Sequence, residues 1–235
     1  MLGLALVSAA RLATLATGRG GAPSGDEWPV VGLALVLVAL AGMRLLLAAG
    51  LTKLEAATVA AGAPLLVLVD APLGDLSPGL SLSANFAGCV LPLLVALKVV
   101  ATPRRLPVLE AIIAVGVAIL VAFLSSHVVP ERGVLLQYRV PALVIGVVAA
   151  ALFHSSPERA GAAGFAAGAI GVLVGADLLH LRELAQSGGA GRVILGGAGL
   201  LDGILLVSLL AALVATCTAV LTRALFRTRV PAGAT

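Results

Sequence analysis

Long apolar segments constrain this sequence more than any other feature. The apolar residues come in runs of about 18–25, the length at which a helix crosses roughly 30 Å of hydrocarbon. Hydrophobic residues make up 60% of the chain and charged residues 11%. A soluble domain carries about 25% charged residues, so this chain has too little charge to cover a surface in water. The sequence therefore predicts an all-α, polytopic transmembrane helix bundle that forms a single integral-membrane domain over residues 1–235.

Turn-forming segments divide the apolar sequence into about eight expected helices. Gly, Pro, Asp and Arg gather in the separators, as in DAPLGDLSPG at 70–79 and TPRRLP at 102–107. The first helix is interpreted as a short membrane helix rather than a signal peptide, because Arg11 interrupts its apolar run and no basic segment precedes it. The expected helices span residues 1–17, 29–49, 54–70, 82–101, 107–127, 140–154, 160–181 and 195–222.

Lysine and arginine are unevenly divided between the two sides of this arrangement. Cytoplasmic loops carry the excess of Lys and Arg, so the side with nine of them is predicted to face the cytoplasm. This predicts a multi-pass protein of the cell inner (cytoplasmic) membrane with both termini inside and with loops 70–79 and 182–192 outside. The nine are Arg44, Lys53, Lys98, Arg104, Arg105, Arg159, Arg223, Arg227 and Arg229, and the other five are Arg19, Arg132, Arg139, Arg182 and Arg192.

The net charge of +4 does not indicate a nucleic-acid partner. The basic residues are scattered singly between apolar runs, without a basic patch or interleaved aromatic residues, so the expected partner is the lipid bilayer. Cys89 and Cys217 lie far apart inside apolar runs and are interpreted as small buried hydrophobic residues. No HExxH, P-loop, GxSxG or CxxC motif is present, and no cofactor or metal is expected.

Glycines recur at alternating spacings of three and four residues within the segment 160–181. This spacing is predicted to stack them on one helix face, where a neighbouring helix can approach backbone to backbone. Close packing is the default interpretation, and the alternative is that the packed helix also positions Asp177, which follows the stripe. The five glycines are Gly161, Gly164, Gly168, Gly171 and Gly175.

Two carboxylates inside apolar runs are the candidate functional residues: Asp177 in VGADLLHL and Asp202 in GGAGLLDGILL. A carboxylate at the bilayer centre costs about 2.5–3.5 kcal/mol, so it normally faces protein or water and marks function. Their helices are consecutive and joined by a short loop, which predicts antiparallel neighbours with the two carboxylates at similar depth. Such a pair would share a proton and activate water, as in aspartic proteases. It would equally well handle a proton or cation, or each carboxylate would separately cap loop amides or pair with an arginine.

Further residues are expected to line the same site. Asn85 opens the helix 82–101, where an N-cap is the default role, and His180 follows Asp177 by three residues and so lies on a nearby face. Asp177, His180 and Asp202 would supply three metal ligands, but no spacing requires a metal. The glycines that flank the two aspartates are Gly175, Gly199 and Gly203.

Four segments resemble a known family: NFAGCVLPLL, SSHVVPERGVLLQYRVPALV, GFAAGAIGVLVGADLLHL and GGAGLLDGILL. They are similar to an uncharacterised family of bacterial and archaeal membrane proteins, the domain-of-unknown-function group numbered one-six-one-four, over about residues 82–215. The family pattern reads like GADLLNL followed by GGAGTFDGIFL. His180 replaces the asparagine and Leu200-Leu201 replace Thr-Phe, so an asparagine-dependent role at position 180 is not carried over. The resemblance implies a membrane fold and no known activity.

A more limited similarity connects the aspartates to intramembrane aspartyl proteases of the presenilin and prepilin-peptidase kind. Those enzymes carry one aspartate on each of two helices, the second in a Gly-x-Gly-Asp motif. Asp177 and Asp202 would be the pair, with Gly197 and Gly199 before the second. Asp202 lies three residues after Gly199, however, and the predicted outer location differs from the inner-leaflet sites of those enzymes. The similarity is one of chemistry.

Three functional hypotheses follow. The first is a membrane-embedded aspartyl-type hydrolase, an intramembrane protease of a membrane-embedded peptide, with Asp177 and Asp202 as the catalytic residues. The second is a proton- or cation-coupled transporter of a small solute, in which Asn85 joins the aspartates at the ion. The third is a non-catalytic membrane subunit in which the acidic pair organises packing. No oligomeric state follows from the sequence.

Overall fold

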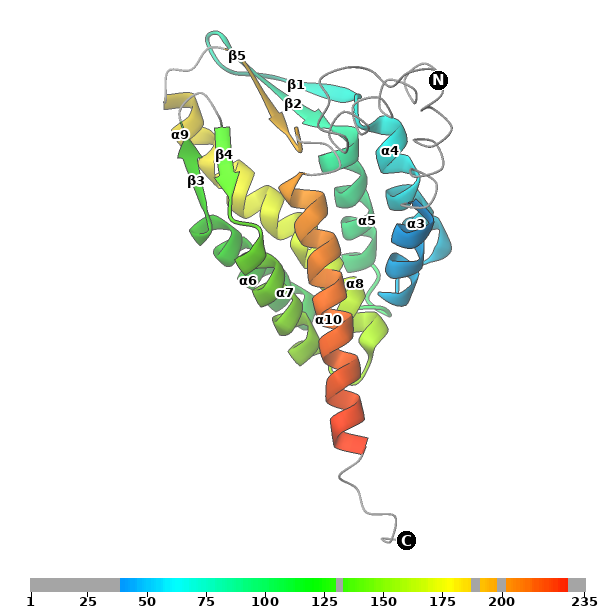
Figure 1. Cartoon of the computed structure of the whole chain (residues 1–235). Coiled ribbons are helices and arrows are strands. Elements are labelled where there is room, and N and C mark those ends of the chain that lie inside the picture. Colours follow the sequence, from blue (N-terminus) through cyan, green and yellow to red (C-terminus); the bar gives the residue numbers. More distant parts are fainter. Residues whose placement is uncertain (1–38, 130–132, 187–190, 198–201, 228–235) are drawn as a thin grey trace, which may run out of the picture.

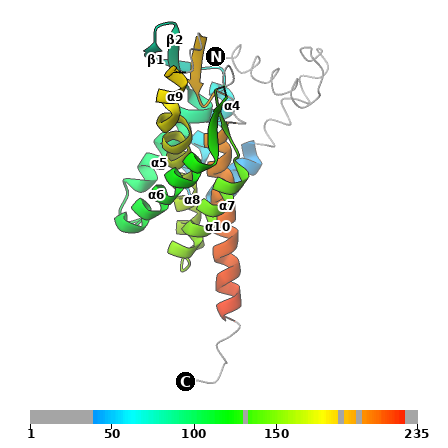
Figure 2. The ribbon, with the colours of Figure 1, turned by 90° about the vertical axis from the view of Figure 1, so that its left-hand side faces the viewer.

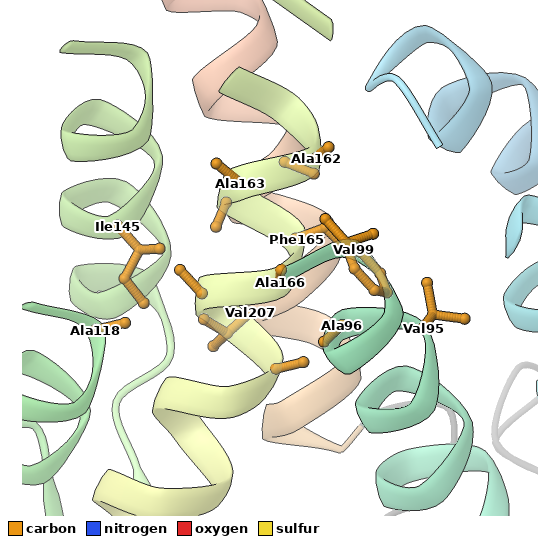
Figure 3. Packing of buried hydrophobic residues seen from close by; sticks show 14 of the residues in the cluster. Val95, Ala96, Val99, Ala118, Ile145, Ala162, Ala163, Phe165, Ala166 and Val207 are labelled. Atoms are coloured by element: carbon orange, nitrogen blue, oxygen red, sulfur yellow. The ribbon is translucent and has the colours of Figure 1, made fainter. Parts of the chain in front are cut away.

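Small side chains place helix α8 (Pro157–Val172) at the centre of the protein. The structure, a computed structural model, describes residues 39–129, 133–186, 191–197 and 202–227. Alanine and glycine dominate α8, and its residues 160–169 are all buried. Ala96, Ala118 and Ile145 come from three neighbouring helices and gather around it (Figure 3). The helices packed on α8 are α5 (Leu91–Val100), α6 (Val108–Leu124), α7 (Arg139–Leu152) and α10 (Gly203–Arg227).

Helices α8 and α10 pack antiparallel along glycines of α8. A Cβ atom added to Gly168 would lie 2.8 Å from the Cα atom of Ser208, and one added to Gly161 would contact the side chain of Thr216. The partner number on α10 falls as the glycine number on α8 rises, so the two chains run in opposite directions. The predicted antiparallel contact between these consecutive helices is confirmed.

The glycine stripe of α8 serves two neighbouring helices, so the prediction that it forms one face for one neighbour is wrong. Added Cβ atoms at Gly161, Gly164 and Gly168 would meet α10, whereas those at Gly171 and Gly175 would meet α6. A mean spacing of 3.5 residues drifts around an α-helix by about 20° per heptad. The π-helical turn η2 (Leu173–Asp177) follows α8 and interrupts the regular helical pattern at the last glycine of the stripe.

Helix α6 presents small side chains inward and large ones outward. Its exposed side includes Leu109, Ile112 and Leu120. Leucine side chains are also exposed on α5, and leucine and valine side chains are exposed on α7 and α10. Small residues at helix contacts are typical of membrane bundles, and an apolar surface of this kind marks contact with lipid or with protein. The buried positions of α6 are Ala111, Ala114, Ala118 and Ala122.

Two helical segments are long and apolar enough to cross a membrane. Pro157–Gln186 has 30 residues and a mean hydropathy of 1.8, and Gly203–Phe226 has 24 residues and a mean hydropathy of 2.6. The first runs from α8 through η2, the 3-10 turn η3 (Leu178–His180) and α9 (Leu181–Gln186). The helical character of the predicted fold is confirmed, but the all-α prediction is wrong, because short strands form two small sheets. A bundle of eight membrane-crossing helices stays a prediction. Shorter apolar helices cover Ala39–Ala48, Phe86–Val100, Val108–Leu124 and Arg139–Leu152.

Two expected helices contain strands at their beginning or end. The expected helix 54–70 is divided into α3 (Lys53–Ala60) and α4 (Gly62–Leu66), and its last residue, Asp70, begins strand β1 (Asp70–Ser77). The expected helix 82–101 starts inside strand β2 (Leu80–Asn85), whose sequence LSLSAN alternates apolar and polar residues. The π-helical turn η1 (Phe86–Val90) then leads into α5.

The expected helix 195–222 begins later than predicted, and two others lie largely outside the described residues. Leu195 ends strand β5 (Gly191–Leu195), and Gly196 adopts φ +71°, a left-handed conformation that favours glycine and stops regular structure. Helix α10 then begins at Gly203. The expected helix 1–17 is not among the residues that the structure describes, and 29–49 is described only from residue 39 onward.

Two small sheets cover one end of the helices, which we call the sheet end (Figures 1 and 2). β1 and β2 pair antiparallel, and β2 and β5 pair in parallel from Leu80–Gly191 to Ala84–Leu195. The second sheet is the hairpin of β3 (Ser126–Val129) and β4 (Gly133–Leu136). The prediction that segments 70–79 and 182–192 lie at the same end is therefore confirmed.

Helix α10 runs toward the opposite end of the molecule (Figure 1). This end carries a cluster of basic residues. We call it the basic end. Here the turn at Gly50, the turn between α5 and α6, and the first turn of α8 meet. Its basic residues are Lys98, Arg104, Arg105, Arg159 and Arg223.

Candidate functional site

Two strand-to-helix junctions meet at the sheet end. β2 runs directly into η1 and α5, and β5 leads toward α10. Since β2 and β5 pair in parallel, their carboxyl ends lie side by side. Glycine at position 196 allows the two junctions to approach closely, because an added Cβ atom there would lie only 2.7 Å from the backbone nitrogen of Cys89 in η1. Asn85 and Asp202 each stand at the start of one of the two helices.

Asn85 is buried and ties β2, β1 and η1 together. Its Oδ1 accepts a hydrogen bond from the Gly88 N–H at 3.0 Å, which makes it the N-cap of η1. Its Nδ2 donates to the Val67 carbonyl and to Asp70 Oδ1, both at 2.8 Å. The default interpretation as an N-cap is confirmed. The Asn85 side chain is thereby committed to protein partners on both its oxygen and its nitrogen.

Asp202 is the N-cap of α10. Its Oδ1 accepts a hydrogen bond from the Ile204 N–H at 2.8 Å, and its backbone carbonyl accepts from the Leu206 N–H at 2.9 Å. The prediction that Asp202 lies inside a helix is wrong, because α10 begins only at Gly203. An N-cap carboxylate satisfies backbone donors of the first turn and lies at the positive end of the helix dipole.

Asp177 lies at the end of the π-helical turn η2, partly buried against the rest of the sheet end. The end of α8 lies near the start of α10, because an added Cβ atom at Gly203, next to Asp202, would lie 3.9 Å from Val172 Cγ1. Asp177 and Asp202 therefore both lie at the sheet end. Cys89 of η1 lies at the same junction beside Gly196, and sequence reasoning set it aside because a lone cysteine in an apolar run gives no signal of its neighbours.

His180 is buried below α9 and contacts α6. Its Nδ1 lies 2.8 Å from the Ala176 carbonyl oxygen. That oxygen can only accept, so Nδ1 carries the proton and donates. The ring lies against Phe123 with a centroid separation of 5.0 Å. These contacts fix the imidazole and close part of η2 by a side-chain hydrogen bond.

The predicted lining glycines have packing roles where the structure describes them. An added Cβ atom at Gly175 would contact the Ile119 carbonyl oxygen of α6, and one at Gly203 would lie 3.0 Å from the Leu136 side chain of β4. Gly199 lies outside the described residues. Gly175 and Gly203 thus allow η2 and α10 to approach their neighbours closely.

A layer of polar contacts covers this site from the side of the first sheet. Arg192 of β5 lies 3.4 Å from Asp70 Oδ2, and its Nε donates to Ser83 Oγ at 2.8 Å. Asp70, the first residue of the expected separator 70–79, begins a strand and pairs with both Arg192 and Asn85. Among the residues that the structure describes, no group of three or more His, Cys, Asp or Glu side chains is placed to hold a metal ion.

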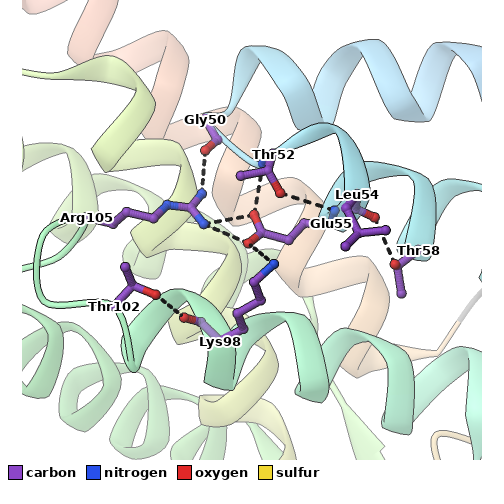
Figure 4. Close-up of polar contacts among 8 residues, drawn as sticks. All are labelled: Gly50, Thr52, Leu54, Glu55, Thr58, Lys98, Thr102 and Arg105. Atoms are coloured by element: carbon purple, nitrogen blue, oxygen red, sulfur yellow. Dashed lines mark hydrogen bonds and ion pairs between the residues drawn. The ribbon is translucent and has the colours of Figure 1, made fainter.

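Sequence reasoning missed a second polar cluster, at the basic end, centred on Glu55 (Figure 4). Only 2% of the Glu55 side chain is exposed. It accepts from the Thr52 N–H at 2.9 Å and from Arg105 Nη1 at 2.8 Å, and Lys98 lies 3.2 Å away. Burial alone would raise the pKa of Glu55, but these donors and the Arg105 charge outweigh it and lower the pKa. The Thr52-x-x-Glu55 capping box was the signal available in the sequence.

Comparison with protein families finds one match. A family model described as "Protein of unknown function (DUF1614)" matches residues 52–214. This range contains Asn85, Asp177 and Asp202, and it begins earlier than the resemblance over 82–215. No curated protein and no solved structure was found to match the chain. The likeness to presenilin-type proteases therefore remains a comparison of chemistry.

Proposed function

Since the chain belongs to the family described as "Protein of unknown function (DUF1614)", which carries no assigned activity, we propose its function from the site: an integral membrane hydrolase of the aspartyl type. Asp177 and Asp202 are its acid–base pair. The observation that carries this proposal is the position of the two aspartates at the sheet end, with Asp177 in the η2 turn that follows α8 and Asp202 at the start of α10. The substrate class is a peptide embedded in the membrane.

The two carboxylates have different surroundings, which suits them to different roles. Two carboxylates within electrostatic reach share one proton more readily than both ionise. The Ile204 N–H and the start of α10 favour the charged form of Asp202, which leaves the proton to Asp177. In the reaction, Asp202 takes a proton from a water molecule as the water oxygen attacks the carbon of the peptide carbonyl. Asp177 gives its proton to the carbonyl oxygen. Collapse of the gem-diol intermediate breaks the C–N bond as the departing amine takes the proton from Asp202 and a hydroxyl of the diol returns its proton to Asp177, which restores the starting protonation states.

The test uses variants that separate charge from helix capping. Asn at position 202 retains the oxygen that accepts from Ile204 but has no charge, so Asp202→Asn should abolish cleavage while leaving thermal stability unchanged. Asp177→Asn should abolish cleavage as well. Asp75→Asn, at an exposed position of β1, is the matched control. The assay is cleavage of quenched-fluorescent transmembrane peptides by the purified chain in phosphatidylcholine liposomes. Cleavage that survives in both aspartate variants would refute the proposal.

A second candidate function is proton- or cation-coupled transport, which the two π-helical turns favour. η1 and η2 both adjoin the acidic pair, and π-helical turns occur frequently at functional sites. Interrupted helices hold coupling ions in many transporters. The test loads the same liposomes with a pH-sensitive dye and applies an external acid pulse. Internal acidification that disappears in Asp177→Asn, without peptide cleavage by the wild type, would favour the transporter.

The proposed orientation places the basic end in the cytoplasm and the sheet end outside, in the inner membrane. The described basic residues support it, because they concentrate at the end opposite the sheets. Single cysteines at Lys53 and at Asp75, both exposed, test it in a background where Cys217 is replaced by Ala. An impermeant thiol reagent should label the cysteine at position 75 in intact cells and spare the one at position 53. The opposite pattern would reverse the orientation.

A further inference from the structure

A cavity at the basic end is lined by three arginines. Its volume is about 320 Å³, near the lower limit of small-ligand sites. It lies between the turn at Gly50, the turn that carries Arg104 and Arg105, and the first turn of α8, which carries Arg159. Ser156 and Glu158 complete the polar part of its wall. With three arginines and one glutamate, the lining carries an excess of two positive charges.

Arg105 is held in place by hydrogen bonds to Gly50 and Glu55. Its Nη2 donates to the Gly50 carbonyl at 2.6 Å, and its Nη1 donates to both oxygens of Glu55 (Figure 4). The Glu55 charge does not make this region negative, because Lys98 pairs with the same carboxylate. The Arg105 guanidinium is therefore a preorganised part of the cavity wall and not a mobile surface group.

Arg104 and Arg159 are the two arginines available to a ligand. Both are exposed, and neither guanidinium makes an ion pair or hydrogen bond with any residue in the part of the chain that the structure describes. Like charges brought together around a cavity repel, so a bound anion would relieve an unfavourable arrangement. The start of the 16-residue α8 adds its positive helix end to the same wall.

We propose that this cavity binds a phosphate group through Arg104, Arg105 and Arg159. Guanidinium groups match the oxygen geometry of phosphate in paired hydrogen bonds, which favours phosphate over a simple halide. The phosphate belongs to the headgroup of an anionic lipid or to a soluble phosphate compound, and both present the same chemistry to the arginines. The cavity lies at the end opposite the acidic pair, so this inference is independent of the proposed hydrolase.

The test measures binding to the purified full-length chain in detergent by the shift of its melting temperature. The probes are phosphatidylglycerol, phosphatidylcholine as the neutral lipid, and inorganic pyrophosphate. A hydrogen bond to a charged group contributes about a tenfold change in affinity or more, so Arg104→Gln/Arg159→Gln should weaken binding at least about tenfold. Arg44→Gln is the control, because Arg44 is exposed on the helix that precedes the Gly50 turn and does not line the cavity.

Each outcome decides the question. A shift by phosphatidylglycerol alone that the double variant loses supports a lipid headgroup, and a shift by pyrophosphate that the double variant loses supports a soluble phosphate. The proposal is overturned if neither phosphatidylglycerol nor pyrophosphate shifts the wild type. It is also overturned if phosphatidylcholine shifts the melting temperature as much as phosphatidylglycerol does while pyrophosphate causes no shift. The same holds if Arg44→Gln weakens binding as much as the double variant.

Discussion

Replacing Gly168 with Ala should destabilise the protein, although alanine is the smallest possible addition. The new Cβ atom would lie 2.8 Å from the Ser208 Cα, where ordinary contacts begin at 3.4 Å, so α8 and α10 would have to separate by about 0.6 Å. The obstacle is backbone and cannot rotate away. Overpacking of a well-packed interior typically costs about 1–3 kcal/mol. The close backbone contact therefore makes even alanine costly at this position.

Gly116→Ala is the matched control for this prediction. Gly116 lies in α6, and an added Cβ atom would meet nothing within 4 Å. Both substitutions give the helix the same gain of about 0.5–1 kcal/mol from replacing glycine, so the difference between them isolates the packing cost. For a chain of this size, 1 kcal/mol shifts the melting temperature by about 2–4 °C. Melting scans in detergent at one scan rate should therefore place Gly168→Ala well below Gly116→Ala. Equal melting temperatures would refute the close contact of α8 with α10.

Three further predictions concern polar residues. Glu55→Gln should cost about 3–5 kcal/mol at neutral pH, because Arg105 loses its buried counter-charge. Folding lowers the pKa of Glu55 below its ordinary value of 4.5, so the stability of the wild type should fall as the pH drops below 4.5. Melting scans at acidic pH should show a smaller fall for Glu55→Gln. An equal fall in both proteins would contradict this. Asp202→Ala should cost about 0.5–2 kcal/mol by removing the cap of α10, whereas Asp202→Asn should be nearly neutral in thermal melting; equal losses would contradict the cap. Asn85→Asp should cost at least about 2 kcal/mol, because it sets a carboxylate against Asp70 and leaves acceptors without a donor. That loss should shrink at acidic pH, and a loss independent of pH would contradict the repulsion.

The central helices were predictable, because apolar length and small-residue spacing are local signals. The segments 107–127 and 140–154 correspond to α6 and α7 with shifts of a few residues, and 160–181 covers α8 together with η2 and η3. Strands β2 and β5 were not predictable, because each is short and lies at the edge of a long apolar run. The alternation in LSLSAN was visible, but a run of six residues competes poorly with the helical reading of the residues that follow. The alanines of α6 were a further readable signal, with spacings that match the glycines they contact.

The candidate site was predictable in its members but not in its bonds. Asp177 and Asp202 stand out because carboxylates are rare in apolar runs. The cap role of Asp202 depends on where α10 begins, and no local pattern in this apolar run marks Gly203 as its first residue. The proximity of Cys89 depends on the parallel pairing of β2 with β5, a contact between distant segments that no local pattern encodes.

The parallel pairing of β2 with β5 also sets the earliest time at which the first sheet can close during synthesis. The Ser81 hydroxyl of β2 donates a hydrogen bond to the Gly191 carbonyl of β5, which lies 110 residues further along the chain. At about 5–20 residues per second, the ribosome needs roughly 5–20 s to deliver β5 after β2 has emerged. Throughout that interval β2 has an open edge, and the glycines of α8 that face α10 have no partner. Asp202 and α10 follow β5 in the chain, so a chain interrupted before β5 has neither the closed sheet nor the complete site.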